Sequence, residues 1–449
     1  MARLGVGALL VALVGAGGIA TVIPETAAAK SASAGTQSLL PTSVLSVRRV
    51  PAWLATTAAT QRLDAVLQAV TGQALTAGSL PSGCLMVSQG DATLFSSNAQ
   101  SMFIPASNLK ILTATAVLDR LAQSDKFVTS VRSATPPSGG VVYGNLYRVG
   151  GGDPDLRTSA YGGGTEGSGT TITSLDKLAQ QVRDSGVTEV TGSVIGDGSR
   201  YDSQRLVPSW KPIYTTEGDV GPLSALDVND GFVPNTTTTT LPPPPQPRPP
   251  TPPPSTQPPS SQPPSSQPPS SQPATTQPPT TQPPSTQPAK PAPTTAPRET
   301  SNSAALAFAA ATDPVAQAAQ AFETLLRKDG VRVDGGARSG LAPAATTVVT
   351  SIDSAPLADE VDAMLSVSDD TAAELFTKEL GYQESHQGTT AAGVAIIRQD
   401  LEADGLPMSQ LVQVDGSGLD RGDRASCNLI VQALNRAGPT GTLAKGLPI

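Results

Sequence analysis

A long tract of Pro, Thr, Ser and Gln, from about Pro234 to Arg298, most constrains what this 449-residue chain can fold into. Units such as PPSSQ, PPTTQ and PPSTQ recur along it. They offer no apolar face that a solenoid could bury, and their proline density favours extended polyproline II. We therefore predict a disordered linker over residues 234–300, with Ser and Thr as candidate O-glycosylation sites, that interrupts a globular protein.

The chain begins MARLGVGALLVALVGAGGIATVIPETAAAK. One early arginine precedes an uncharged apolar stretch from Leu4 to Ile23, and small residues follow at Ala27–Ala29, which is the layout of a secretory signal. The stretch is also close to the ~20 residues that span a bilayer, so an uncleaved membrane anchor is the alternative. We expect an extracytoplasmic protein, secreted or held in the cell wall or periplasmic space, with a signal peptide or anchor at residues 1–29.

Composition removes several classes of function. A formal net charge of -8 argues against binding to nucleic acid, which requires a basic face. The one histidine, His386, lies in the polar stretch YQESHQGTT, so a Ser-His-Asp triad would depend on that single residue. Zinc sites built on several histidines are excluded, and two distant cysteines do not replace them. We predict no metal and no cofactor.

The stretch FIPASNLKILTATAVLDRLA, Phe103–Ala122, carries the main candidate site. Its apolar residues follow a 3.6-residue period, so Ser107 and Lys110 lie on one face near the start of a buried helix. A lysine amine beside a serine hydroxyl can take its proton where the surroundings favour the neutral amine, and no histidine is then needed. The alternative is two polar residues that open a helix. Ser174 and Lys177 repeat the spacing in SLDKLAQQV, where we expect an ordinary amphipathic helix.

Further motifs follow in a fixed order: a GGGDP turn at 150–154, Ser-Ala-Pro-Leu at 354–357, Ser-Asp-Asp at 368–370 before a helix, and Asp-Gly-Ser-Gly-Leu at 415–419. With Ser-Asn-Leu-Lys at 107–110, this order resembles the D-alanyl-D-alanine carboxypeptidase/endopeptidase family. These are the low-molecular-mass class C penicillin-binding proteins, peptidase family S13. The resemblance covers most of Arg62–Phe232 and Asp313–Ile449.

The resemblance implies an α/β fold, in which a penicillin-binding-protein/β-lactamase-like transpeptidase domain of helices on an antiparallel sheet is split by an inserted αβ domain. The expected divisions of the chain follow its composition and motifs. They are a signal or anchor at 1–29, a disordered segment at 30–50, the catalytic domain at 51–125 and 346–449, the inserted domain at 126–233 and 301–345, and the Pro-rich linker at 234–300.

In this family the Ser-x-x-Lys serine attacks the D-Ala-D-Ala amide and the lysine acts as its base, which assigns these roles to Ser107 and Lys110. The second family motif is Ser-x-Asn. Its serine, here Ser368, relays a proton, and its asparagine position, which binds the substrate amide, is Asp370. An aspartate there accepts from the lysine but has lost the amide donor, and its charge favours the protonated lysine, a weaker base.

The third family motif, Lys-Thr-Gly, does not occur between DGSGL and Ile449. The segment GPTGTLAKGLPI contains Thr440-Gly441-Thr442, but Pro439 before it supplies no cation. We therefore expect a chain truncated before this motif.

The expected function is hydrolysis of peptidoglycan stem peptides by a serine D-Ala-D-Ala carboxypeptidase that β-lactams inhibit covalently. The alternative, favoured by Asp370 and the missing third motif, is a catalytically impaired homologue that acts as a cell-wall binding module. A β-lactamase is a third possibility, although such enzymes normally lack so large an insertion.

Cys84 and Cys427 complete the expectations. Two cysteines in an exported chain indicate one disulfide, and two buried thiols are the alternative. In the resembling fold both cysteines flank the catalytic domain, so a bond between them would join the two halves that the insertion separates.

Overall fold

The computed structural model describes residues 10–14, 61–69, 83–161, 172–234 and 308–447. All of these belong to one compact unit, Met1–Asn235 with Ser301–Ile449. The expectations for the disordered segment at 30–50, for nearly all of the Pro-rich linker and for most of the signal or anchor concern residues outside this description. Among the described residues, no helix is long and apolar enough to cross a membrane.

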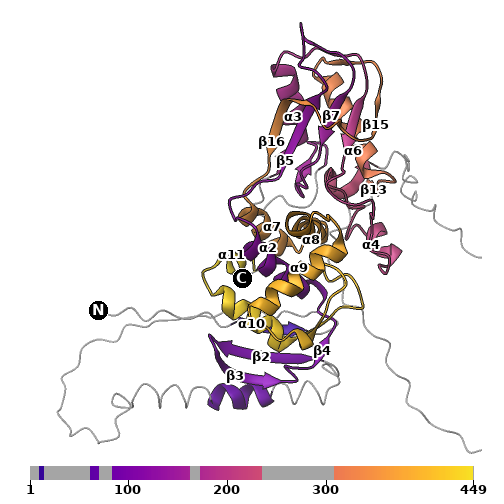
Figure 1. Ribbon diagram of the computed structural model, residues 1–449. Helices are drawn as coiled ribbons and strands as arrows, with labels where there is room; N and C mark the ends of the chain where they lie inside the picture. The colour runs from indigo at the N-terminus through magenta and orange to yellow at the C-terminus, as the bar shows by residue number, and fades with distance from the viewer. Residues whose placement is uncertain (1–9, 15–60, 70–82, 162–171, 235–307, 448–449) are drawn as a thin grey trace, which may run out of the picture. The chain divides into compact units, whose positions relative to one another are not determined.

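The helix that carries Lys110, α2 (Leu109–Arg120), forms the centre of a first hydrophobic core. Every residue from Leu109 to Val117 is buried, so the helix is covered on all sides. Figure 1 shows it among the later helices of the chain, and each of these contacts it. They are α7 (Leu357–Val367), α8 (Asp370–Ser385), α9 (Thr390–Ala403), α10 (Cys427–Ala437) and α11 (Thr442–Lys445).

Short antiparallel strands complete this lobe, which we call the catalytic lobe after the domain that the sequence analysis predicts here. The stretch CLMVSQGDATLFSS forms a hairpin, and Gly90 takes a left-handed conformation at its turn. One sheet holds β1 (Leu10–Val14), β2 (Cys84–Gln89) and β3 (Ala92–Ser97), and another holds β17 (Leu411–Val412), β18 (Arg424–Ser426) and β4 (Met102–Phe103). A short helical turn, η4 (Met408–Gln410), precedes β17, and residues 61–69 are helical.

A second core belongs to the inserted lobe. Its main sheet has the order β15-β11-β7-β5-β16, in which β15, β11 and β7 run parallel while β5 is antiparallel to β7 and β16. Their bounds are Ala337–Ser339, Val194–Asp197, Leu146–Val149, Val128–Ser133 and Thr347–Asp353. The amphipathic helices α3 (Leu175–Asp184) and α6 (Pro314–Lys328) supply apolar side chains to the same core. Since β16 pairs with β5, residues 347–353 lie in this sheet, although the sequence analysis assigned them to the catalytic domain.

Smaller elements extend the inserted lobe. A parallel sheet joins β14 (Arg332–Val333), β10 (Glu189–Val190) and β6 (Val141–Val142), and two pairs join β8 (Leu156–Arg157) with β9 (Thr173–Ser174) and β12 (Phe232–Pro234) with β13 (Phe308–Ala310).

The segment that ends the first half of the insertion forms a third, small core. It contains α4 (Pro212–Thr216) and the turn η3 (Asn229–Gly231). Trp210, Leu223 and other apolar side chains of this segment pack against Leu375 of α8, so part of the insertion rests on this helix. Lys378 and Glu379 of α8 strengthen this junction, because Lys378 pairs with Asp202 and Glu379 pairs with Arg200.

Candidate active site

Ser107 lies in a single 3-10 turn, η2 (Ala106–Asn108), that runs directly into α2. Ala106 has a left-handed backbone (φ 48), and the Ser107 side chain is exposed to solvent. Lys110 follows three residues later and is only 1% exposed. Its Nζ donates a hydrogen bond to Ser107 Oγ at 3.3 Å. The helix therefore presents an accessible hydroxyl whose neighbour is a buried amine.

Two further acceptors hold the Lys110 amine. Nζ donates to the carbonyl oxygen of Ser417 at 3.0 Å and pairs with the carboxylate of Asp370. These partners come from different parts of the chain, since Asp370 begins α8 and Ser417 lies in the DGSGL turn. Packing thus brings Ser107, Lys110, Asp370 and the 415–419 turn to one place.

Asp370 is a partly buried carboxylate with a displaced pKa. Its side chain is 14% exposed, and burial raises its pKa to about 6, an increase that the charge and hydrogen bond of Lys110 limit. The carboxylate also sits in the first turn of α8, where backbone N–H groups favour a negative charge. At neutral pH Asp370 is therefore mainly ionised and forms an ion pair with the candidate base.

Ser368 ends α7 in the left-handed conformation (φ 61) and is exposed. Among the described residues, none forms a hydrogen bond with its hydroxyl. Asp369 between it and Asp370 caps α8 by accepting from the N–H of Ala372 at 2.8 Å. The structure thus places Ser368 beside the site along the chain without connecting its hydroxyl to Lys110.

The 415–419 turn is the part of the site to which sequence analysis gave no role. Glu374, fully buried on α8, accepts from the N–H groups of Gly416 and Ser417, both at 2.8 Å. Thr113 of α2 donates to the carbonyl of Gly416 at 2.7 Å. Burial and the nearby charge of Asp415 raise the pKa of Glu374 to about 8. The DGSGL motif was visible in the sequence, but nothing in the motif itself indicated that it would contact Lys110.

The look-alike motifs have ordinary structural roles. Ser174 caps α3 by accepting from the N–H of Lys177 at 3.2 Å, so this serine and lysine are joined through the backbone. The triplet Ser-Cys-Asn at 426–428 also has the Ser-x-Asn pattern of the second family motif, and its Ser426 caps α10 in the same way. Thr442 begins α11, so the segment that superficially resembles the third family motif is helical there.

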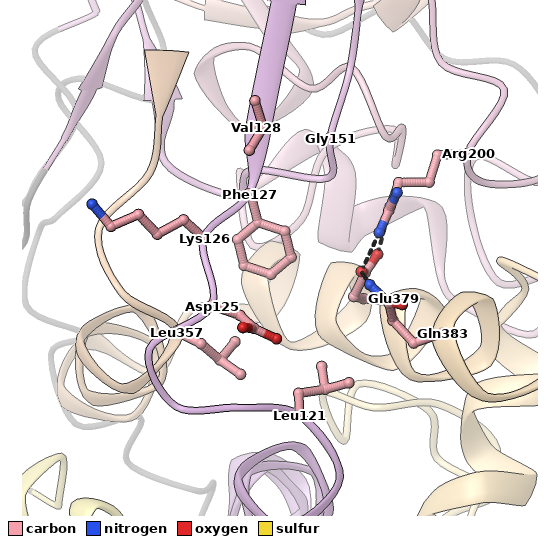
Figure 2. A pocket seen from close by; sticks show the side chains of 10 residues that line it. All are labelled: Leu121, Asp125, Lys126, Phe127, Val128, Gly151, Arg200, Leu357, Glu379 and Gln383. Atoms are coloured by element: carbon pink, nitrogen blue, oxygen red, sulfur yellow. Dashed lines mark hydrogen bonds and ion pairs between the residues drawn. The ribbon is translucent and has the colours of Figure 1, made fainter. Parts of the chain in front are cut away.

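A cavity of about 320 Å³ lies elsewhere, at the start of β5 (Figure 2). Its lining includes Asp125, Phe127 and Leu357, together with the ion pair between Arg200 and Glu379 that Figure 2 marks. Neither Ser107 nor Lys110 lines it. The exposed serine is therefore reached from another part of the surface.

One group of carboxylates in the described part of the chain is close enough to share a cation: Asp119, Asp400 and Asp404. Arginines already neutralise it, because Arg436 pairs with Asp119 and Asp404, and Arg120 pairs with Asp400.

Cys84 of β2 and Cys427 of α10 form a disulfide, with their Cα atoms 6.0 Å apart and a sequence separation of 343. Both belong to the first core, so the bond joins the two halves of the catalytic lobe on either side of the insertion.

Comparisons with known proteins agree with this architecture. The model of the D-Ala-D-Ala carboxypeptidase 3 (S13) family matches residues 73–449. A D-alanyl-D-alanine carboxypeptidase of Actinomadura sp. is 27% identical over 358 residues, which are 77% of this chain and 62% of that protein. A carboxypeptidase of Mycobacterium tuberculosis is 33% identical over 138 residues, 30% of this chain and 28% of that protein. This chain thus matches under two thirds of the length of either relative.

Among solved structures, penicillin binding protein 4 (dacB) from Haemophilus influenzae superposes with a TM-score of 0.53 at 16% identity. The match covers 77% of this chain and 72% of that one. It confirms the predicted fold class, a mixed α/β protein with this family's architecture.

Proposed function

Because this chain belongs to the D-Ala-D-Ala carboxypeptidase 3 (S13) family, we propose that it is an exported serine DD-peptidase that hydrolyses peptidoglycan stem peptides. One observation carries this proposal: the exposed Ser107 hydroxyl accepts a hydrogen bond from the buried amine of Lys110, one helical turn away. A nucleophile and its base must lie within hydrogen-bonding reach of each other.

The proposed reaction has two steps. The neutral Lys110 amine takes the proton of Ser107, and Oγ attacks the carbonyl carbon of the terminal D-Ala-D-Ala amide. The C–N bond breaks, the leaving D-Ala amine receives a proton, and an ester joins the rest of the peptide to Ser107. Water then hydrolyses the ester. Backbone N–H groups at the start of α2 are suitable donors for the oxyanion that forms at each step.

Ser368 and Asp370 have supporting roles in the proposal. Ser368 relays the proton from Lys110 to the leaving amine, which requires its exposed hydroxyl to rotate toward the site once substrate is bound. Asp370 occupies the position that borders the substrate amide, but its carboxylate pairs with Lys110. This pairing favours the protonated lysine and slows the first step.

The same ion pair supports a second candidate function. If Asp370 keeps Lys110 protonated, the protein binds stem peptides in the cell wall with little or no turnover. Its role is then that of a cell-wall binding module.

A fluorescent penicillin tests the proposal, because β-lactams mimic the D-Ala-D-Ala amide and trap the acyl-enzyme. We expect covalent label on the wild-type protein and none on Ser107→Ala, with equal melting temperatures for the two. Ser174→Ala is the matched control and should label like wild type. Folded wild-type protein that binds peptidoglycan sacculi without labelling would support the binding module instead. Rapid release of hydrolysed label would indicate a β-lactamase.

A further inference from the structure

The 415–419 turn is wedged between the nucleophile and α8. Gly418 has a left-handed backbone (φ 88), and a Cβ added there would lie 2.0 Å from the carbonyl oxygen of Ala106. A Cβ on Gly416 would lie 1.9 Å from Oγ1 of Thr377 on α8. Only glycine therefore allows the turn to approach both surfaces this closely, and at Gly418 the approached surface is the backbone beside Ser107.

Asp415 fixes this turn with both carboxylate oxygens. The side chain is fully buried, and Oδ1 accepts from the N–H of Gly418 at 2.8 Å. Oδ2 accepts from the Trp210 indole and from the N–H of Asp420, each at 2.8 Å. Hydrogen bonds to an ionised acceptor are about twice as strong as neutral ones.

The N–H of Gly418 and the carbonyl of Ser417 belong to the same peptide group. Asp415 accepts from one end of this group, and the other end accepts from Lys110 Nζ at 3.0 Å. Hydrogen bonds joined in this way polarise one another, so a carboxylate at the N–H end strengthens the carbonyl as an acceptor. The arrangement also fixes the direction in which the carbonyl points.

We infer that Asp415 is a positioning residue for the Lys110 base, acting through the Ser417–Gly418 peptide, and that Trp210 of the insertion holds Asp415 in place. The inference rests on the proposed serine–lysine function. It gives the inserted lobe a part in assembling the site, because the Trp210 indole reaches Asp415 from a segment of the chain 205 positions away.

Asp415→Asn tests this inference because all three groups that bind the carboxylate are donors. An asparagine amide must direct its NH₂ group at one or two of them, which breaks the arrangement while side-chain volume is kept. Since one unmade buried hydrogen bond is worth ~1–3 kcal/mol, we expect acylation by a fluorescent penicillin to slow about tenfold or more. Trp210→Phe, which removes a single donor, should slow it less.

Asp423→Asn is the matched control. Asp423 is equally buried in the same loop and accepts from the N–H of Val414 through Oδ1, and its carboxyl also interacts with that of Asp415. Burial and the charge of Asp415 raise its pKa to about 9, so the carboxyl is already neutral at pH 7 and an amide replaces it closely. Acylation should stay within twofold of wild type. Equal slowing in the Asp415 and Asp423 variants would mean general damage to the loop and would overturn the inference.

A second readout does not depend on acylation. The ¹⁵Nζ resonance of Lys110, identified by its loss in Lys110→Met, should shift in Asp415→Asn and stay in place in Asp423→Asn. If wild-type protein does not label but this pattern appears, the proposed function fails while the positioning role stands. If wild type labels and the Lys110 resonance is unchanged in Asp415→Asn, the inference fails while the proposed function stands.

Discussion

Lys110 and Arg148 are both cations that the fold removes from solvent, one in each lobe, with exposures of 1% and 0%. Lys110 has three hydrogen-bonded partners: Ser107, Asp370 and the Ser417 carbonyl. Arg148, on β7 of the inserted lobe, has no hydrogen-bonded partner for any guanidinium nitrogen among the described residues, and its closest compensation is the Phe322 ring, 5.3 Å away.

The difference shows what burial of a charge can indicate. A buried charge lowers the free energy of unfolding unless partners offset its lost hydration. Around Lys110 the offset comes from three separate segments, and one of them carries Ser107, the nucleophile of the proposed reaction. Around Arg148 the described residues provide only the face of the Phe322 ring and no hydrogen-bond acceptor, so the charge is expected to destabilise the fold.

Removal of the Lys110 amine should have the largest effect. Lys110→Met keeps most of the buried stem but cannot accept the Ser107 proton, and general base catalysis contributes about 10²–10⁴-fold. We expect acylation by a fluorescent penicillin to fall at least about a hundredfold while circular dichroism shows a folded protein. Lys177→Met, at the look-alike motif, should acylate at the wild-type rate. Normal labelling of Lys110→Met would contradict the role of Lys110 as the base, and its three partners would then have no role in acylation.

Removal of the Cys84–Cys427 bond tests whether the two lobes differ in stability. It closes a loop of 343 positions that includes the whole insertion. The chain-entropy model assigns such a loop about 4–5 kcal/mol of unfolding free energy. We expect a Cys84→Ser, Cys427→Ser double variant to lose much of this from the catalytic lobe, with amides of α2 exchanging hydrogen faster than those of the β5–β7 pair. Mass spectrometry of unreduced, alkylated protein checks the premise, since two alkylated cysteines would remove it.

Sequence analysis found the local half of the site. Ser107 and Lys110 lie one helical turn apart, so periodicity placed them on one face. The same spacing at Ser174 was predicted to belong to an ordinary amphipathic helix, and there the structure shows a capping hydrogen bond from the backbone of Lys177. The Ser417 carbonyl is 307 positions from Lys110. No local pattern encodes such a contact, because it depends on how α8 and the DGSGL turn pack against α2.

The inserted lobe shows the same limit. Its helices and strands follow from periodicity and turn residues, but three successive residues of β7, Leu146, Tyr147 and Arg148, are all buried. Both faces of this strand are therefore covered. The sequence LYRV is equally compatible with an edge strand that exposes its arginine and with a strand covered on both faces. Burial of Arg148 therefore could not be predicted from the sequence.

Asp370→Asn should sharpen the contrast by changing one partner of Lys110. It restores the amide donor and removes the charge that favours the protonated lysine. A buried hydrogen bond of ~1–3 kcal/mol corresponds to a roughly tenfold gain in acylation. Slower acylation would show that Asp370 assists the base or does not occupy the asparagine position.

The pH dependence of stability offers a second measurement on the same variant. Burial raises the pKa of Asp370 from 3.8 to about 6, so the folded protein binds its proton more tightly than the unfolded chain does. The contribution of this group to stability is therefore fully present below pH 3.8 and is lost as pH rises to about 6. In urea titrations, Asp370→Asn should remove that part of the decline between pH 4 and 6.

Arg148→Met should give the smallest effect, and we expect it to increase the free energy of unfolding. Methionine keeps an unbranched apolar stem against Phe322 and removes a guanidinium whose pKa burial lowers to about 9. Because no partner is left unpaired, we expect unfolding free energy to rise by about 1–3 kcal/mol.

Lys378→Met is the matched control: Lys378 is as buried but pairs with Asp202, so its loss should lower stability. The gain for Arg148→Met should shrink above about pH 9, since wild type is stabilised as its arginine loses the proton. A loss of stability in Arg148→Met, measured by urea titration at pH 7, would mean that this buried charge has a partner of its own.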